Sequence, residues 1–142
     1  MNTETLLEPP TQTLDDRAII HLPFGLLGFE QVKSYILLAA PNEKPFMWMQ
    51  MMDAPRKSFL IVSPFLVMPE YQLDIPERDV EFLDLTEPTD ALVFNICTLR
   101  GPGNATINLK APLVINRYTL ICKQVIPDNA SQYALNHPLL VT

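Results

Sequence analysis

Residues 91–110, Ala-Leu-Val-Phe-Asn-Ile-Cys-Thr-Leu-Arg-Gly-Pro-Gly-Asn-Ala-Thr-Ile-Asn-Leu-Lys, decide the fold class. The run from Ala91 to Leu99 is largely apolar and is typical of a buried strand. Gly101-Pro-Gly-Asn104 is a strong turn signal. From Ala105 to Lys110 apolar and polar residues alternate, as in a strand with one buried face. The stretch therefore predicts two β-strands joined by a short turn.

Similar short runs occur on both sides of these two strands. They predict strands over 17–21, 35–40, 46–52, 58–67, 71–75, 113–115 and 120–126, and an edge strand over 139–141. Pro64 predicts a bend or an edge position in the fourth run, because proline cannot donate to a β-ladder. One short helix is predicted after Pro76, with Val80 and Leu83 on one face. Residues 29–32 are predicted to form one helical turn.

This pattern of about eight to ten short strands and one short helix predicts an all-β fold. We expect a small antiparallel domain, either barrel-like or a sandwich. The length of 142 residues fits a single domain over 1–142, in which residues 1–16 form a flexible or edge-strand lead-in. The 14 prolines argue against long helices, because each one removes a backbone donor.

The stretch from Phe46 to Met52 holds four of the six methionines and the only tryptophan, Trp48. It predicts a core strand that is buried on both faces. The alternative is an adaptable partner surface, since methionine side chains repack easily.

Charge and targeting signals exclude several classes of protein. Ten Lys and Arg against sixteen Asp and Glu give a net charge of −6, which opposes direct nucleic-acid binding. No run approaches the ~20 apolar residues that span a membrane, and the N-terminus has no signal-peptide pattern. We therefore expect a cytoplasmic protein without membrane contact, in which Cys97 and Cys122 are reduced and buried.

The chain contains no recognisable catalytic or metal-binding motif. His21 and His137 are far apart in sequence, and the cysteines and histidines have no zinc-site spacing. The four glycines form no phosphate-binding loop. We expect no enzyme activity, no metal and no cofactor. Two alternatives stay open: a hydrolase that uses His21 or His137, and a small-molecule-binding β-barrel whose cavity is lined by residues 47–49.

Acidic residues are concentrated in one segment. Residues 70–90 contain eight acids and only Arg78 as a base, so this segment carries −7 and the rest of the chain +1. Such a run either solvates a helix face or forms a docking patch for a basic partner. The candidate protein-binding residues are Glu70, Asp74, Glu77, Asp79, Glu81 and Asp84.

Asn108 and Asn116 lie on either side of Pro112, at the junction between two predicted strands. The chain must bend there because proline does not fit a central strand. We expect the two asparagine side chains to cap backbone groups that the bend leaves free.

Six motifs follow one another between residues 17 and 139: residues 20–30, 46–50, 64–71, 108–116, 123–126 and 137–139. Residues 20–30 contain the pattern Pro-x-Gly-x-x-Gly-Phe-Glu, and residues 46–50 contain Phe-x-Trp-x-Gln. Together they resemble the motifs of FliW, a family of bacterial flagellar assembly factors. The residues that match the family pattern are Pro23, Gly25, Gly28, Phe29, Trp48, Pro64, Phe65, Asn108, Lys110, Pro112, Asn116, His137 and Pro138.

The resemblance implies a protein-binding regulator that switches between two partners. It implies that the protein binds the translational repressor CsrA and prevents it from holding flagellin mRNA. Free flagellin would compete for the same protein and release CsrA, and secretion of flagellin would reverse this. The implied partners are CsrA and flagellin, with no direct nucleic-acid contact and no small-molecule substrate.

Overall fold

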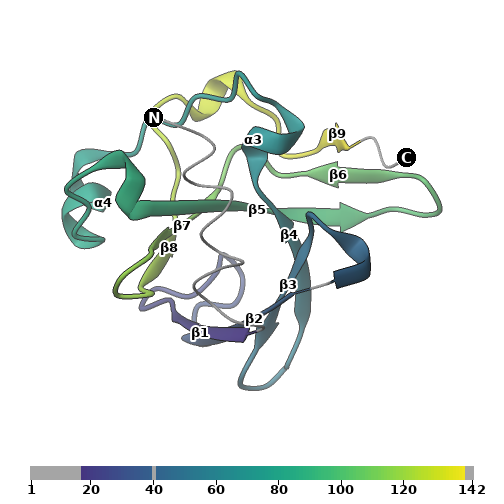
Figure 1. The fold of residues 1–142 in the computed structure, drawn as a ribbon, viewed down its shortest axis with the longest axis horizontal. Helices are drawn as coiled ribbons and strands as arrows, with labels where there is room; N and C mark the ends of the chain where they lie inside the picture. Colours follow the sequence, from purple (N-terminus) through teal and green to yellow (C-terminus); the bar gives the residue numbers. More distant parts are fainter. Residues whose placement is uncertain (1–16, 40, 140–142) are drawn as a thin grey trace.

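The computed structural model describes residues 17–39 and 41–139, and in this part of the chain nine strands form one sheet (Figure 1). The strands are β1 (Arg17–His21), β2 (Ser34–Ala39), β3 (Met47–Met51), β4 (Ser58–Val62), β5 (Ala91–Leu99), β6 (Ala105–Ile107), β7 (Leu113–Asn116), β8 (Cys122–Gln124) and β9 (His137–Leu139). The helices are α3 (Pro64–Val67) and α4 (Glu77–Phe82), with three short 3-10 turns, η1 (Pro41–Glu43), η2 (Pro88–Asp90) and η3 (Ala130–Gln132).

Every pair of neighbouring strands is antiparallel, and the long strand β5 organises the sheet. Its first half, residues 91–94, pairs with β7, and its second half pairs with β4 and β6. In Figure 1, β5 crosses the molecule from the side of α4 to the β5–β6 turn. A bridge between His21 and Ile121 joins the end of β1 to β8, and the His21 amide donates to the Leu120 carbonyl at 3.0 Å. The sheet is therefore barrel-like, and the prediction of an all-β antiparallel fold is confirmed.

The inner face of the sheet carries the largest core. Alternate residues of β2 and β3 contribute Tyr35, Leu37, Met47, Met49 and Met51, all of them buried. Leu22 and Leu26, from the loop after β1, pack in the same core. The period-2 pattern of the strands therefore decides which side chains face inward.

The outer face of the sheet is covered by residues 63–90, the connection between β4 and β5. Phe65 and Tyr71 from this connection pack on Leu60, Val62 and Val93. Further along, Leu83 packs on Ala91, Val114 and Val125, beside the half-buried Ile75 and Leu85. The segment that holds most of the acidic residues is thus an amphipathic cover whose apolar side is fixed on the sheet.

Several local expectations were wrong. Residues 71–75 form no strand, because this extended segment bonds irregularly to residues 128–133 instead of joining a ladder. The predicted strand 58–67 ends at Val62, and Pro64 starts a helix, where its missing N–H costs nothing. Residues 29–32 form turns without a helix. β3 is not buried on both faces: its methionines are buried, whereas Trp48 and Gln50 are half-buried.

Other strands differ from their predicted bounds. β6 ends at Ile107, where the expected strand ran to 110, and β8 covers only Cys122–Gln124 of 120–126. The closing strand is β9, His137–Leu139, and residues 140 and 141 of the edge strand predicted over 139–141 lie outside the described residues. The expectation for residues 1–16 also falls outside them. None of the helices in the described ranges is long and apolar enough to cross a membrane.

Candidate partner-binding surface

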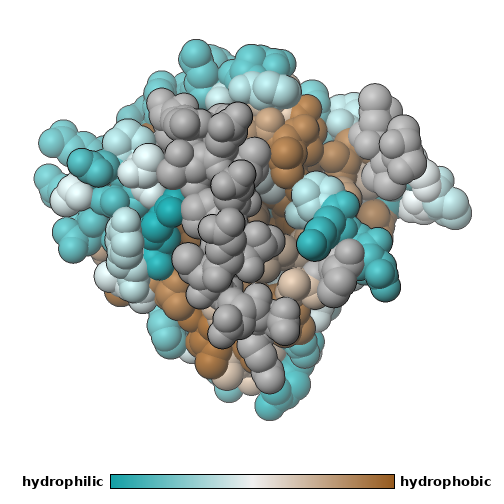
Figure 2. All heavy atoms as spheres, viewed as in Figure 1, coloured by the Kyte–Doolittle hydropathy of each residue, from teal (hydrophilic) through white to brown (hydrophobic). Residues whose placement is uncertain are grey.

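The connection 63–90 displays most of its acidic side chains to solvent. Glu70, Asp74, Glu77, Glu81, Asp84 and Glu87 are exposed, as is Arg78. Figure 2 shows a largely hydrophilic surface on the side of the molecule where α4 lies. Of the six predicted protein-binding residues, five therefore lie on the surface, and these stay candidates for partner binding.

Asp79 is the exception, because its side chain is only 3% exposed. The Lys123 Nζ atom of β8 donates a charge-assisted hydrogen bond to the Asp79 carboxylate. Since the two charges neutralise each other inside the structure, Asp79 joins α4 to the sheet and adds little to the surface charge.

The same lysine lies against two aromatic rings. Lys123 Nζ is 5.2 Å from the centroid of the Phe24 ring and 6.0 Å from that of Phe82. The two rings contact each other with centroids 5.0 Å apart. Phe24 belongs to the glycine-containing loop after β1, and Phe82 belongs to α4, so this cluster joins the loop motif to the acidic segment.

This cluster leaves apolar surface exposed. Phe24 is 55% exposed, Leu27 65% and Phe82 39%. The Leu27 amide donates to the Gln124 side chain at 2.9 Å, which holds the tip of the loop on β8. Exposed apolar side chains that gather in one place are typical of interaction surfaces.

The loop conformation depends on its glycines and on Glu30. Gly25 has φ +66° and Gly28 has φ +91°. The Gly28 amide donates to the Glu30 carboxylate at 3.1 Å, and this bond holds the pKa of Glu30 below its usual value. Phe29 is half-buried and meets Phe59 edge-on at 5.9 Å. The motif residues Pro23, Gly25, Gly28 and Phe29 therefore shape the loop that exposes Phe24 and Leu27.

Asp90, at the other end of the acidic segment, is also structural. Its carboxylate accepts hydrogen bonds from the Thr86 hydroxyl and from the amides of Thr86 and Glu87, at 2.8, 3.0 and 3.0 Å. These bonds lower the pKa of Asp90, and the bond from the Thr86 side chain has the largest effect. Asp90 therefore stays ionised and fixes the turn that leads into β5.

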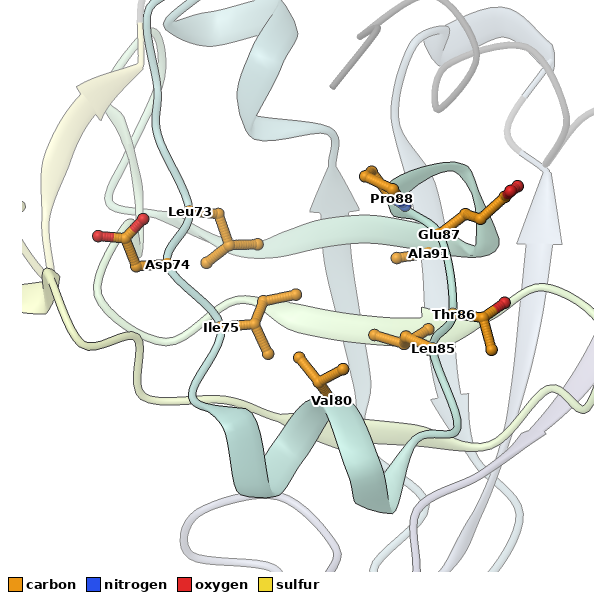
Figure 3. A pocket seen from close by; sticks show the side chains of 9 residues that line it. All are labelled: Leu73, Asp74, Ile75, Val80, Leu85, Thr86, Glu87, Pro88 and Ala91. Carbon is orange, nitrogen blue, oxygen red and sulfur yellow. The ribbon is translucent and has the colours of Figure 1, made fainter.

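An apolar groove lies between the two arms of the connection (Figure 3). It has a volume of about 420 Å³ and is lined by Leu73, Asp74, Ile75, Val80, Leu85, Thr86, Glu87, Pro88 and Ala91. In Figure 3 the side chains of Leu73, Ile75, Val80 and Leu85 point toward one another, while those of Asp74 and Glu87 point outward on opposite sides. A second hollow of about 470 Å³ shares Leu73 and Asp74 and extends to Phe65 and Glu70.

The two predicted capping asparagines satisfy backbone groups as expected. The Asn108 Oδ1 atom accepts from the amides of Lys110 and Ala111 at 2.9 and 3.2 Å. The buried Asn116 accepts from Tyr118 and Thr119 and donates to the carbonyls of Leu83 and Asp84. Asn116 therefore also ties the end of α4 to the β7–β8 turn.

The remaining motif residues are spread through the fold. Trp48 packs half-buried against the outer core, Phe65 is buried there edge-on to Tyr71, and Pro64 is buried at the start of α3. Lys110 donates to the Ala130 carbonyl at 3.0 Å, near the buried Pro112. His137 and Pro138 pair with β6 in the edge strand β9. These residues do not converge on one site.

The structure offers no support for a catalytic or metal centre in the described residues. Within those ranges, no group of three or more His, Cys, Asp and Glu side chains is placed to hold a metal ion. Cys97 and Cys122 are both free and buried, as predicted. Burial raises the pKa of the Cys97 thiol to about 12 and raises that of Cys122 as well.

Sequence reasoning missed the groove and the Phe24–Phe82 cluster. The alternation of Tyr71, Leu73 and Ile75 indicates an apolar face, but a strand and an irregular extended segment share this pattern. Nothing local in sequence indicates that Phe24 and Phe82 would meet.

Comparison with known proteins gives a consistent result. The family described as FliW protein matches residues 8–139. A flagellar assembly factor FliW of Treponema pallidum (strain Nichols) is 41% identical over 116 residues, covering 81% of this chain and 77% of that protein. A protein of the same description from Bacillus subtilis (strain 168) is 32% identical over 127 residues, covering 89% and 88%. A crystal structure of the flagellar assembly factor FliW superposes with a TM-score of 0.76 at 32% identity, covering 87% of this chain and 86% of that one.

Proposed function

This chain belongs to the FliW family, and from that premise we propose that it is a flagellar assembly factor. We propose further that it acts in the cytoplasm as a protein-binding regulator rather than as an enzyme. Its family membership supports the first statement. The second statement rests on the resemblance to the same family.

The proposed partners are the translational repressor CsrA and flagellin, which would occupy the protein in turn. Binding of CsrA would relieve the repression of flagellin mRNA, and binding of free flagellin would release CsrA. This partner switch follows from the family resemblance and needs no cofactor, no membrane and no direct contact with nucleic acid.

The observation that carries the proposal is the acidic surface of the β4–β5 connection. CsrA binds RNA, so part of its surface must be basic, because phosphate contacts dominate such binding. The six exposed carboxylates of residues 70–87 would attract this basic partner and repel RNA near it. Docking beside the RNA site would then be enough to displace the message.

The test measures association with CsrA in stopped-flow experiments. The variant Glu77→Lys, Glu81→Lys, Asp84→Lys reverses three exposed carboxylates and leaves the Asp79–Lys123 pair intact. We expect association at low salt to slow about tenfold or more, since charges at the rim of an interface mainly change the association rate. The effect should shrink above ~0.3 M salt, where the screening length falls below ~6 Å.

The control is Glu43→Lys, Asp53→Lys, which reverses two exposed acids outside the acidic segment, so the rates are compared per reversed charge. This control should change the rate much less than the triple variant. An unchanged rate for the folded triple variant would place the CsrA interface elsewhere. A wild-type protein that binds neither CsrA nor flagellin would contradict the proposed function itself.

The alternative of a small-molecule site at residues 47–49 gains no support. Met47 and Met49 are buried in the inner core, and Trp48 packs against the outer one. The described hollows along residues 65–91 lie elsewhere.

A further inference from the structure

We propose that the groove between residues 73–75 and 85–91 binds an extended segment of a partner protein, in which aliphatic side chains are flanked by lysine or arginine. This inference rests on the proposed function as a protein-binding regulator and adds the site and the chemistry of the bound segment. Neither the family match nor the acidic patch by itself specifies them.

The floor of the groove favours an apolar occupant. Leu73, Ile75, Val80 and Leu85 come from both arms of the connection and from α4, and each is only half-buried. Their side chains converge on one hollow (Figure 3). A volume of about 420 Å³ lies within the ~300–1,000 Å³ that is usual for binding pockets. Aliphatic side chains that enter it would complete the burial of this surface.

The rim of the groove favours a basic occupant. Asp74 lies on one side and Glu87 on the other, and Glu70 borders the adjoining hollow. All three carboxylates are exposed. The chain's own residues 1–16 carry four acids and no base, and a second copy has a net charge of −6. Charge therefore disfavours both of these occupants and favours a basic segment from another protein.

The backbone of the groove wall suits an extended occupant. The amides of Gln72 and Asp74 donate to the side chains of Tyr133 and Asn129, and the carbonyls of Gln72 and Asp74 accept from Asn129 and Asp128. Between them, Leu73 and Ile75 make no backbone hydrogen bond within the described ranges. No hydrogen bond within these ranges competes for their amide and carbonyl groups, as recognition by strand addition requires.

Three labelled synthetic peptides test the inference on the full-length protein by fluorescence anisotropy. The first has a Leu-Ser-Val centre with three lysines on each side. The second replaces Leu and Val by serine, and the third replaces the lysines by glutamates. We expect the first to bind at low salt, the second to bind at least tenfold more weakly, and the third not to bind. Equal binding of the first two would overturn the inference, because the apolar floor would then have no role.

Two variants locate the binding of the first peptide. The rim variant Glu70→Lys, Asp74→Lys reverses Asp74 on the rim and Glu70 beside the adjoining hollow. We expect it to lose at least tenfold in affinity, whereas the control Glu43→Lys, Asp53→Lys should change the affinity less than twofold. Val80→Phe fills the groove and should also weaken binding. Should Val80→Phe not fold, the rim variant alone decides, because both of its residues are exposed. Unchanged affinity in a folded rim variant overturns the inference.

The results separate this inference from the proposed function. If the first peptide fails to bind while the wild-type protein still binds CsrA and flagellin, the groove assignment alone is wrong. If the peptide binds as expected and neither protein does, the partners were wrongly proposed and the groove assignment stands.

Discussion

At the scale of single residues, the two glycines of the loop after β1 differ in their tolerance of a side chain: Gly25 has no room for one, whereas Gly28 does. Both have positive φ, which costs any other residue about 1 kcal/mol or more. A Cβ atom on Gly25 would also lie 2.6 Å from the Glu30 Cα and 2.7 Å from two backbone oxygens. A Cβ on Gly28 would meet no atom within 4 Å.

We therefore expect Gly25→Ala to lower the free energy of unfolding by about 3 kcal/mol or more and to displace Phe24 and Leu27. Gly28→Ala should lower the free energy of unfolding by only about 1–2 kcal/mol, because the positive φ is its only source of strain. Urea unfolding of the two variants measures the difference. Equal losses would mean that the loop relaxes around the new methyl group at Gly25 without strain.

At the scale of elements, the β4–β5 connection is held on the sheet by a few long-range polar contacts. Lys123 bonds to Asp79, Asn116 donates to the carbonyls of Leu83 and Asp84, and the Tyr71 hydroxyl donates to the Leu109 carbonyl at 2.9 Å. These contacts fix both arms of the groove and the end of α4. The surface proposed to bind partners is therefore attached to the sheet through Lys123, Asn116 and Leu109.

We expect Lys123→Met to lower the free energy of unfolding by about 3 kcal/mol, because the Asp79 carboxylate would stay buried without its counter-charge. The double variant Asp79→Asn, Lys123→Met should recover most of this loss, since no charge is then left inside. Chemical unfolding of the single and double variants forms the test. A double variant less stable than Lys123→Met would contradict this, because the lost stability would then come from the attraction within the pair and not from the unpaired carboxylate.

At the scale of the whole molecule, burial keeps two tyrosine hydroxyls and two cysteine thiols protonated to higher pH than in the unfolded chain. Burial raises the pKa of Tyr35, Tyr71 and Cys97 to about 12 each, and it raises that of Cys122 as well. In the unfolded chain, thiols ionise near pH ~8.5 and phenols near ~10. The unfolded state therefore loses protons before the folded state does, and stability falls as the pH rises from about 9 to 12.

The prediction concerns Cys97→Ala, Cys122→Ala. At pH 7 we expect a loss of about 1 kcal/mol for each site and unchanged partner binding, since both thiols only fill core space. Between pH ~8.5 and ~10 the double variant should lose less stability than the wild type, because each thiol contributes up to ~1.4 kcal/mol per pH unit. Urea unfolding across this pH range measures both slopes. Identical slopes, or lost binding in the folded variant, would contradict a purely structural role.

Much of the architecture follows from local pattern. Clean alternation or apolar runs indicated β2, β3, β5 and β6, and the Pro76 signal placed α4 within one residue of its start. The pattern failed where contacts with distant segments decide the local structure. Residues 71–75 alternate like a strand because one side rests on the sheet, but none of the strands in the described residues pairs with them. Residues 64–67 are as apolar as a strand, yet they form one helical turn.

The sequence by itself determined the all-β class, the FliW family and the concentration of acid in residues 70–90, because periodicity, motif order and charge are local properties of the chain. Only the tertiary structure decided which acidic side chains are exposed and which are buried in ion pairs. In sequence Asp79 and Glu81 look alike, but Asp79 meets Lys123, 44 residues away, and Glu81 faces solvent. The groove likewise exists only where residues 73–75 and 85–91 converge over β5. Burial and pairing depend on contacts between distant segments, and no local pattern encodes them.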